Sequence, residues 1–210
     1  LGTTSGTVSI GAFAAGLTGS PVSFTATATA GAAFGLITVS GDGQTAAAGT
    51  AFALPLVVRV VDGFGNGVSG VEVTFSSLDG ASAFSDTVVT SDASGLVSVT
   101  ATAATLAGGG LISAEAPSIS PTSFGVTITP AAAAALTFPV FTVTGDAGQP
   151  FGAIEAAVVD VYGNVVTDFT DSATISIVSA PAGATIGGTL TRAPVAGGRW
   201  MCWRKAPSTR

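Results

Sequence analysis

The sequence predicts an all-β protein built from tandem β-sandwiches of about 100 residues each. Three observations support this fold class. Apolar residues alternate with Ser, Thr and Ala along much of the chain. Gly, Pro, Asp and Asn interrupt these runs about every 8 to 12 residues, and similar segments recur about 100 residues apart. The chain has 210 residues, which is long enough for two such domains.

Alternation defines the individual strands. The apolar residues lie two positions apart, so that one face of each strand is apolar and the other polar, as in a half-buried antiparallel sheet. In chain order, these positions are Val8 and Ile10; Val22, Phe24 and Ala26; Val71, Val73 and Phe75; Val97, Val99 and Ala101; Phe124, Val126 and Ile128; and Ile175 and Ile177.

One short segment has helical propensity. Ala131–Ala135 lies between Pro130 and Pro139, and the space between the two prolines is too short for a stable helix. We interpret this segment as an inter-domain linker that leads into the next strand.

An internal repeat divides the chain. The segment Leu56–Val68 returns as Ala156–Val166, and upstream of it Val39–Gln44 returns as Val143–Gln149. Spacings of 98 residues between the matched aspartates of the first pair and 104 residues between the matched valines of the second indicate a period near 100 residues. Such a period corresponds to one sandwich and is too long for a solenoid repeat.

The repeat predicts four parts. Residues 1–34 match the last two strands of an incomplete unit and are possible donor strands, and residues 35–130 form a complete unit. Residues 131–198 match the opening strands of a further unit that lacks its last strands. Residues 199–210 form an atypical basic and aromatic tail, which we interpret either as a sequence boundary or as a docking peptide. The two incomplete units are complementary, because each has the strands that the other lacks.

The same turn follows a predicted strand in both copies. It reads Asp62-Gly-Phe-Gly65-Asn66 in the first and Asp160-Val-Tyr-Gly163-Asn164 in the second, and the chain contains no other Asn. An Asp at the end of a strand accepts hydrogen bonds from N–H groups of the turn, whereas Gly and Asn tolerate positive φ. The predicted structural turn residues are therefore Asp62, Gly65, Asn66, Asp160, Gly163 and Asn164.

These motifs resemble the bacterial immunoglobulin-like (Ig-like) repeats of invasin- and intimin-type surface adhesins and of secreted repeat proteins. The resemblance is carried by Val60–Val68, Val71–Phe75 and Thr90–Val99, with Val158–Phe169 as the second copy, and it covers residues 1–196. It implies tandem Ig-like Greek-key β-sandwiches that serve as a spacer or an adhesive surface.

Calcium binding is an alternative interpretation of the same turns, because Asp and Asn supply the hard oxygen ligands that calcium prefers. The candidate calcium ligands are Asp62, Asn66, Asp160 and Asn164. The EF-hand pattern is absent, since Phe64 and Val73 stand where that motif requires oxygen ligands. We therefore interpret these residues as turn caps and predict no catalytic residue and no cofactor, with calcium as the open alternative.

Charge and composition exclude several classes of function. Residues 1–191 contain all 12 carboxylates and a single cation, Arg59, so this part cannot neutralise the phosphates of nucleic acid or of an anionic bilayer surface. No apolar run approaches the roughly 20 residues of a membrane-spanning helix. The chain has no His and one Lys, Lys205, so nucleophilic catalysis lacks a general base. We predict a protein that is not an enzyme, does not bind nucleic acid and does not insert into a membrane.

The sequence predicts an extracellular or cell-surface structural protein, namely an Ig-like repeat module of a bacterial surface filament, stalk or adhesin. The expected partners are other copies of itself or flanking Ig-like repeats, and a host or polysaccharide surface. An alternative function is a carbohydrate- or polymer-binding accessory module of a secreted enzyme. Such a module would carry exposed aromatic rings in line on one sheet.

The incomplete units suggest two ways of forming a chain of sandwiches. In the first, Gly6–Leu17 and Pro21–Gly31 of one copy complete the sandwich begun by residues 131–196 of the next, and head-to-tail strand complementation builds a filament. In the second, the 210 residues are a window of a longer polypeptide of tandem repeats.

Overall fold

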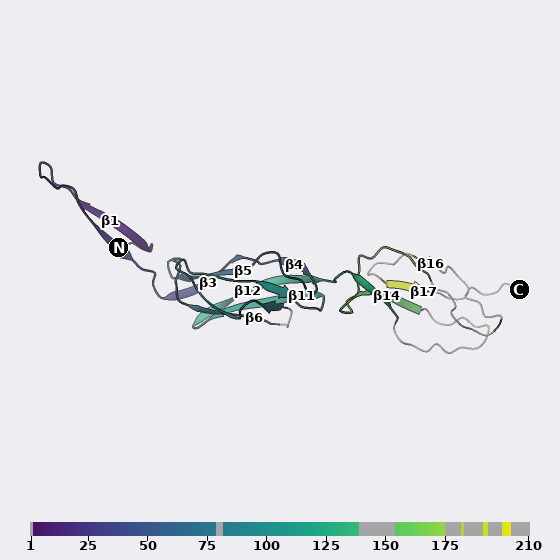
Figure 1. Ribbon diagram of the computed structural model, residues 1–210. Coiled ribbons are helices and arrows are strands. Elements are labelled where there is room, and N and C mark those ends of the chain that lie inside the picture. Colours follow the sequence, from purple (N-terminus) through teal and green to yellow (C-terminus); the bar gives the residue numbers. More distant parts are fainter. Residues whose placement is uncertain are drawn as a thin grey trace. The chain divides into compact units, whose positions relative to one another are not determined.

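The computed structural model describes residues 2–78, 82–138, 154–174, 182, 191–192 and 199–202. The chain divides into two compact units. Unit 1 consists of residues 1–104 and 108–128, and unit 2 consists of residues 105–107 and 129–210. All the regular elements of the described residues are strands, which confirms the all-β prediction (Figure 1). No helix in these residues is long and apolar enough to cross a membrane.

Unit 1 contains a sandwich of two antiparallel sheets. The first sheet has the order β3-β5-β9 and the second has the order β4-β12-β11-β6-β8, while β7 and β10 form a separate pair. The strands of the first sheet are β3 (Ala33–Ser40), β5 (Leu56–Asp62) and β9 (Leu96–Val99). Those of the second are β4 (Gln44–Ala47), β12 (Ile119–Thr129), β11 (Gly108–Ala116), β6 (Glu72–Ser77) and β8 (Val88–Thr90). The separate pair consists of β7 (Ser82–Phe84) and β10 (Ala101–Ala103).

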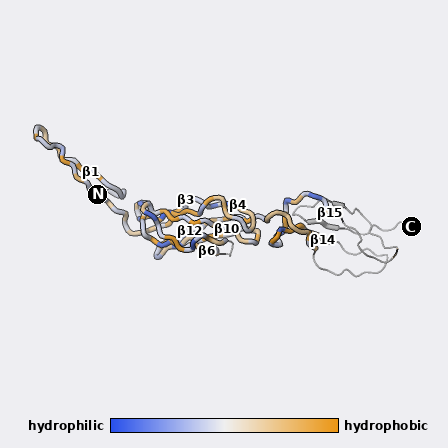
Figure 2. Tube along the Cα trace, viewed as in Figure 1, coloured by the Kyte–Doolittle hydropathy of each residue, from blue (hydrophilic) through white to orange (hydrophobic). Residues whose placement is uncertain are grey.

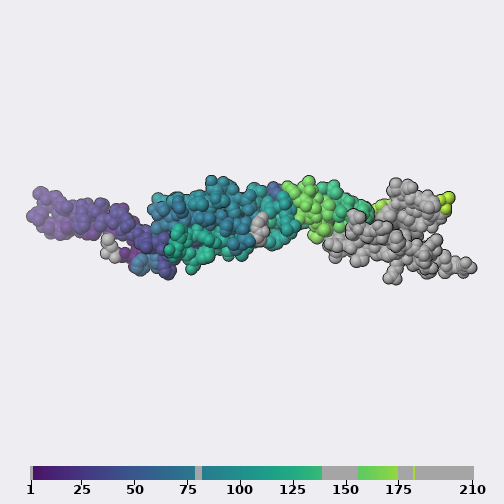
Figure 3. All heavy atoms as spheres, turned by 90° about the horizontal axis from the view of Figure 1, so that it is seen from below, coloured from purple at the N-terminus to yellow at the C-terminus, as the bar shows by residue number. Residues whose placement is uncertain are grey.

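The core of unit 1 lies between these sheets. Its largest fully buried side chains come from both of them: Leu56, Val58, Val60 and Val97 from the first sheet and Val73, Phe75, Ile112 and Phe124 from the second. Figure 2 shows hydrophobic residues along these strands, and Figure 3 shows this part of unit 1 as a continuous mass of atoms. The alternation predicted for Val73 and Phe75, and for Phe124, Val126 and Ile128, thus corresponds to inward-facing positions.

Unit 1 also contains a two-stranded hairpin. Its strands, β1 (Gly6–Ala12) and β2 (Val22–Ala28), pair antiparallel and form a sheet of their own. Every residue of β1 is exposed, and in β2 only Ala26 and Ala28 are half-buried. Among the residues that the structure describes, none forms an apolar layer that buries the alternating residues of this hairpin.

Unit 2 repeats the opening of the unit 1 sandwich. Its first sheet has the order β13-β14-β17, formed by β13 (Ala133–Thr137), β14 (Ile154–Asp160) and β17 (Arg199–Cys202), and a second pair is formed by β15 (Ala173–Thr174) and β16 (Thr191–Arg192). Ala133 is opposite Asp160 and Leu136 is opposite Val158, just as Ala33 is opposite Asp62 and Leu36 is opposite Val60 in unit 1. Both strand pairs have a register shift after their first residue pair.

The first residues of the predicted tail take part in this sheet. β17 pairs with β14 in the register in which β9 pairs with β5, because Ile154 is opposite Cys202 as Leu56 is opposite Val99. The sequence Arg199-Trp-Met-Cys202 lacks the small alternating residues of β9, so the pattern gave no sign of a strand there. The four-part division of the chain stays a prediction. Residues 203–210 and the predicted strand positions Ile175 and Ile177 lie outside the described residues.

Candidate functional site: a repeated Asp–Asn turn

The turn that follows β5 is organised by one carboxylate. Asp62 is buried, and its Oδ1 accepts hydrogen bonds from the backbone N–H groups of Phe64 and Asn66, both at 2.9 Å. Its Oδ2 accepts hydrogen bonds from the side-chain amide of Asn66 at 2.9 Å and from the backbone N–H of Gly31 at 2.8 Å. Gly65 closes the turn at a φ of +86°, where a side chain would be strained.

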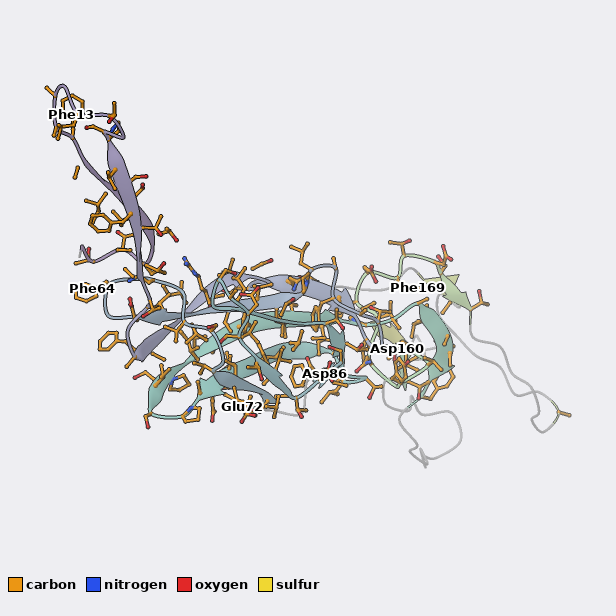
Figure 4. The ribbon with its side chains drawn as sticks, turned by 60° about the vertical axis from the view of Figure 1, so that its left-hand side comes forward. Phe13, Phe64, Glu72, Asp86, Asp160 and Phe169 are labelled. Atoms are coloured by element: carbon orange, nitrogen blue, oxygen red, sulfur yellow. The ribbon has the colours of Figure 1, made fainter. Side chains whose placement is uncertain are left out.

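The turn that follows β14 has the same bonds. Asp160 Oδ1 accepts from the backbone N–H groups of Tyr162 at 2.9 Å and Asn164 at 2.8 Å. Its Oδ2 accepts from the Asn164 side chain and from the backbone N–H of Ala131, both at 2.8 Å. Gly163 has a φ of +89°. Figure 4 labels Asp160 at this place in unit 2, and Phe64 at the equivalent turn of unit 1.

The asparagine of each turn binds a second backbone segment that is distant in sequence. In unit 1, Asn66 accepts a hydrogen bond from the backbone N–H of Ser5 at 2.8 Å and donates one to the carbonyl of Thr3 at 2.8 Å. In unit 2, Asn164 accepts from the backbone N–H of Ala107 at 2.8 Å and donates to the carbonyl of Thr105 at 2.7 Å. Each of these segments leads directly into a hairpin strand, β1 or β11.

Each turn therefore holds two other pieces of chain. The aspartate binds the segment that enters the first strand of the sandwich, at Gly31 before β3 or at Ala131 before β13. The asparagine binds the segment that enters a hairpin strand. The structure thus brings together the predicted turn residues of each copy, and it adds partners that the prediction did not name. A Thr-x-x-Gly pattern at Thr3–Gly6 and Thr105–Gly108 is the sequence signal that could have found them.

These hydrogen bonds keep the aspartates ionised. The bond from the Asn66 side chain is the largest cause that lowers the pKa of Asp62 far below its usual value, and the backbone N–H of Gly31 is the next. Burial by itself would raise the pKa of Asp160. The hydrogen bonds from Asn164, Ala131 and Tyr162 outweigh that burial and lower the pKa of Asp160 to about 2.

A third aspartate caps a turn without an asparagine partner. Asp92 Oδ1 accepts hydrogen bonds from the hydroxyl and the backbone N–H of Ser94 and from the backbone N–H of Leu96, at 2.7 to 2.9 Å. The Ser94 hydroxyl is the largest cause that lowers the pKa of Asp92. The carboxylate of Asp92 binds only residues of its own turn, whereas the carboxylate and the amide of each Asp–Asn turn also bind segments distant in sequence.

The geometry gives little room for calcium at the candidate ligands. A carboxylate has about four lone-pair sites. Four N–H groups already occupy those of Asp62 and of Asp160. In the described residues no group of three or more His, Cys, Asp or Glu side chains is placed to hold a metal ion. The arrangement is therefore suited to fixing backbone segments in place.

No family model matches the chain, and no curated protein matches its sequence. Solved structures that are similar to it include three of different kinds. Domains 4 and 5 of the S-layer protein SbsC have 16% identity and a TM-score of 0.39, with 51% of this chain and 58% of that chain covered. A β-glucuronidase from glycoside hydrolase family 2 has 19% identity and a TM-score of 0.40, with 60% and 14% covered. Invasin, a bacterial integrin-binding protein, has 19% identity and a TM-score of 0.39, with 82% and 34% covered.

The chain spans less than two thirds of the length of each of these proteins. Invasin, whose type of surface adhesin the sequence motifs resemble, is thus among the solved structures to which the chain is similar.

Proposed function

We propose that this chain is a non-enzymatic structural part of an extracellular or cell-surface protein, in which Ig-like sandwiches follow one another as a stalk, a filament or the shaft of an adhesin. The observation that carries the proposal is the repeated Asp–Asn turn. In both units the carboxylate accepts the same four hydrogen bonds, and the asparagine accepts one bond from a distant backbone segment and donates one to it. Such repetition of local contacts is expected of a modular structural protein.

A short linker with a bound amide has few conformations. Three residues, 130–132, separate β12 from β13, and the N–H of the middle one is bound by Asp160. Four residues, 29–32, separate β2 from β3, and the N–H of Gly31 is bound by Asp62. The bound amides thus restrict the conformations of these two short segments, which favours a structural function.

The use of the carboxylates supports an inert structural function. Carboxylates in the described residues are used as turn caps at Asp62, Asp92 and Asp160, and the sequence offers no His. The accessory-module alternative requires exposed aromatic rings in line on one sheet. In the described residues the exposed aromatics lie on separate elements: Phe24 on β2, Phe34 on β3, and Phe13, Phe64, Phe138 and Tyr162 outside the strands. We therefore favour the structural function.

The location is tested on intact cells of the source organism. Antibodies raised against residues 33–129 are expected to label intact cells, and protease added to the medium is expected to remove the label. Antibodies against a cytosolic protein serve as the control and label only lysed cells. Labelling that appears only after lysis would refute the proposed location.

A further inference from the structure

The β1–β2 hairpin is the same structural element as the β11–β12 hairpin of the sandwich. Ile10 is opposite Phe24 as Ile112 is opposite Phe124, and Gly6 is opposite Ala28 as Gly108 is opposite Ile128. Gly6 and Gly108 both have positive φ, at 137° and 154°. Both hairpins are entered from a segment bound by the asparagine of an Asp–Asn turn. The paired residues of β1 and β2 therefore correspond to those of β11 and β12 from Gly108 opposite Ile128 to Ala114 opposite Thr122.

The burial of the two hairpins is opposite. Ile112 and Phe124 are both fully buried, at 0% exposure. At the corresponding positions of the other hairpin, Ile10 is 41% exposed and Phe24 is 57% exposed. Val22, which lies on the same side of β2 as Phe24, is also exposed. The β1–β2 hairpin thus presents the apolar face of a sandwich hairpin without the opposite sheet.

The structure shows what covers this face in a complete unit. In unit 1, the first sheet (β3-β5-β9) lies opposite the β11–β12 hairpin, and its buried Leu56, Val58, Val60 and Val97 form the core together with Ile112 and Phe124. Within its own sheet, β11 pairs with β6, and Phe124 lies against Phe75 of β6 with ring centroids 6.4 Å apart. On the other side, β12 lies beside β4. The occupant that fits the β1–β2 hairpin is therefore the first part of an Ig-like unit, with strands in the arrangement of β3, β5, β6 and β9.

Unit 2 has that arrangement. β13, β14 and β17 pair in the registers of β3, β5 and β9, and β15 follows the Asp–Asn turn as β6 does. β15 pairs with β16, as β6 pairs with β8. In the described residues of unit 2, no hairpin takes the place that β11–β12 has in unit 1.

Unit 2 also has an apolar groove at the place where the hairpin turn would lie. The groove has a volume of about 340 Å³, and Leu136, Val158, Phe169 and Ala173 are among the residues that line it. In unit 1, Glu115 at the end of β11 is opposite Thr74 near the start of β6, so the hairpin turn lies beside that start. The start of β15 at Ala173 is part of the groove wall.

The turn of the β1–β2 hairpin carries side chains that suit this groove. Phe13 is 76% exposed and Leu17 is 67% exposed, and Figure 4 shows Phe13 at the turn of the hairpin. Residues 1–41 contain no charged side chain. Natural proteins commonly protect exposed strand edges with charges, especially Lys, and this hairpin has none. No charged side chain on this hairpin therefore opposes the pairing of its edges with further strands.

We propose that the β1–β2 hairpin of one copy inserts into unit 2 of a second copy, where Ile10 and Phe24 enter the core, and Phe13 and Leu17 occupy the groove at Leu136 and Val158. The contact joins two different surfaces of the chain, so it does not close on itself and extends head to tail. This inference deepens the proposed function, because it gives the structural module a way to assemble.

The test measures the mass in solution of the full 210-residue chain and of four variants over a range of concentrations, by size-exclusion chromatography with light scattering. Phe24→Asp places a charge on the apolar face of the hairpin, and Leu136→Asp places one in the groove. Thr27→Asp and Thr137→Asp are the matched controls, because both residues are exposed and neither belongs to the docking surfaces. We expect the unchanged chain and both controls to form oligomers whose mass rises with concentration, and both docking variants to be monomers.

Mixing the two docking variants gives the decisive result. Phe24→Asp keeps an intact groove and Leu136→Asp keeps an intact hairpin, so one functional contact remains between them. We expect a 1:1 dimer of two 20.1-kDa chains that forms only in the mixture and does not grow further. This result also shows that neither variant has simply failed to fold.

Two outcomes would overturn the proposal. One is an unchanged chain that stays monomeric up to high micromolar concentration. The other is a Phe24→Asp variant that assembles as well as Thr27→Asp. Either outcome leaves the antibody test of the cell-surface location unaffected, so failure of the assembly and failure of the proposed function can be told apart.

Discussion

The two equivalent hairpins allow the contribution of burial to be measured within one molecule. We expect Phe124→Ala to destabilise unit 1 strongly, because the ring is fully buried and packs against Phe75 at a centroid distance of 6.4 Å. Phe24→Ala removes the same ring from the corresponding position of β2, where it is 57% exposed. The chemical change is identical, and only the surroundings of the ring differ.

The expected magnitude follows from the burial. Replacing a buried Phe by Ala in a core reduces the free energy of unfolding by about 3–5 kcal/mol, which combines lost transfer energy with the cavity left behind. Since about 1.4 kcal/mol corresponds to a tenfold change in an equilibrium constant, protection of the core amides falls by about two to three and a half powers of ten. The ring of Phe24 is more than half exposed, so we expect Phe24→Ala to change the stability of unit 1 by less than about 1 kcal/mol.

Hydrogen exchange measured by mass spectrometry is the suitable assay, because it reports each unit separately. Peptides that cover β5 and β11 follow the unfolding of unit 1. The reasoning would be refuted if Phe124→Ala and Phe24→Ala reduced the protection of these peptides equally, or if Phe124→Ala left it unchanged. Equal effects would mean that the β1–β2 hairpin is packed as tightly as β11–β12.

Three further predictions concern the turns. The ionised Asp160 contributes stability that is fully present above the unfolded pKa of about 3.9 and is lost as the pH falls through its folded pKa of about 2. The thermal midpoint of unit 2 should therefore fall across that pH window, and Asp160→Asn should flatten the dependence of this midpoint on pH. An equally steep pH dependence in the variant would contradict this. Gly95→Ala should destabilise unit 1 severely, because the added Cβ would lie 2.4 Å from the carbonyl oxygen of Val60. Gly43 has a similar positive φ, but a Cβ added there meets no atom within 4 Å, so Gly43→Ala should reduce the free energy of unfolding by only about 1–2 kcal/mol. Urea unfolding that ranks the two variants in the opposite order would be inconsistent with the structure. Calcium or a chelator should leave the thermal midpoints of unit 1 and unit 2 unchanged, because N–H groups occupy the carboxylates of Asp62 and Asp160. A midpoint that rises with calcium would restore the interpretation of these turns as calcium sites.

Local sequence was enough to predict the strands and the residues of the turns. Alternation placed Val73, Phe75 and Phe124 on inward faces, because the side-chain period of a strand is two and one face must be buried. The recurrence of Asp and Asn at the same turn singled out Asp62 and Asn66, since five of their hydrogen bonds lie within the five residues of the turn. β17 escaped prediction, because Arg199–Cys202 has none of the alternation of β9.

The tertiary structure decided which distant segments these strands and turns contact. Asn66 binds Thr3 and Ser5 across more than 60 residues, and a turn motif contains no information about a partner so distant in sequence. The patterns around Phe24 and Phe124 predict the same strand, yet one ring is 57% exposed and the other is fully buried. Alternation states which face of a strand is apolar, whereas burial requires an opposite sheet, and only the fold determines whether one is there.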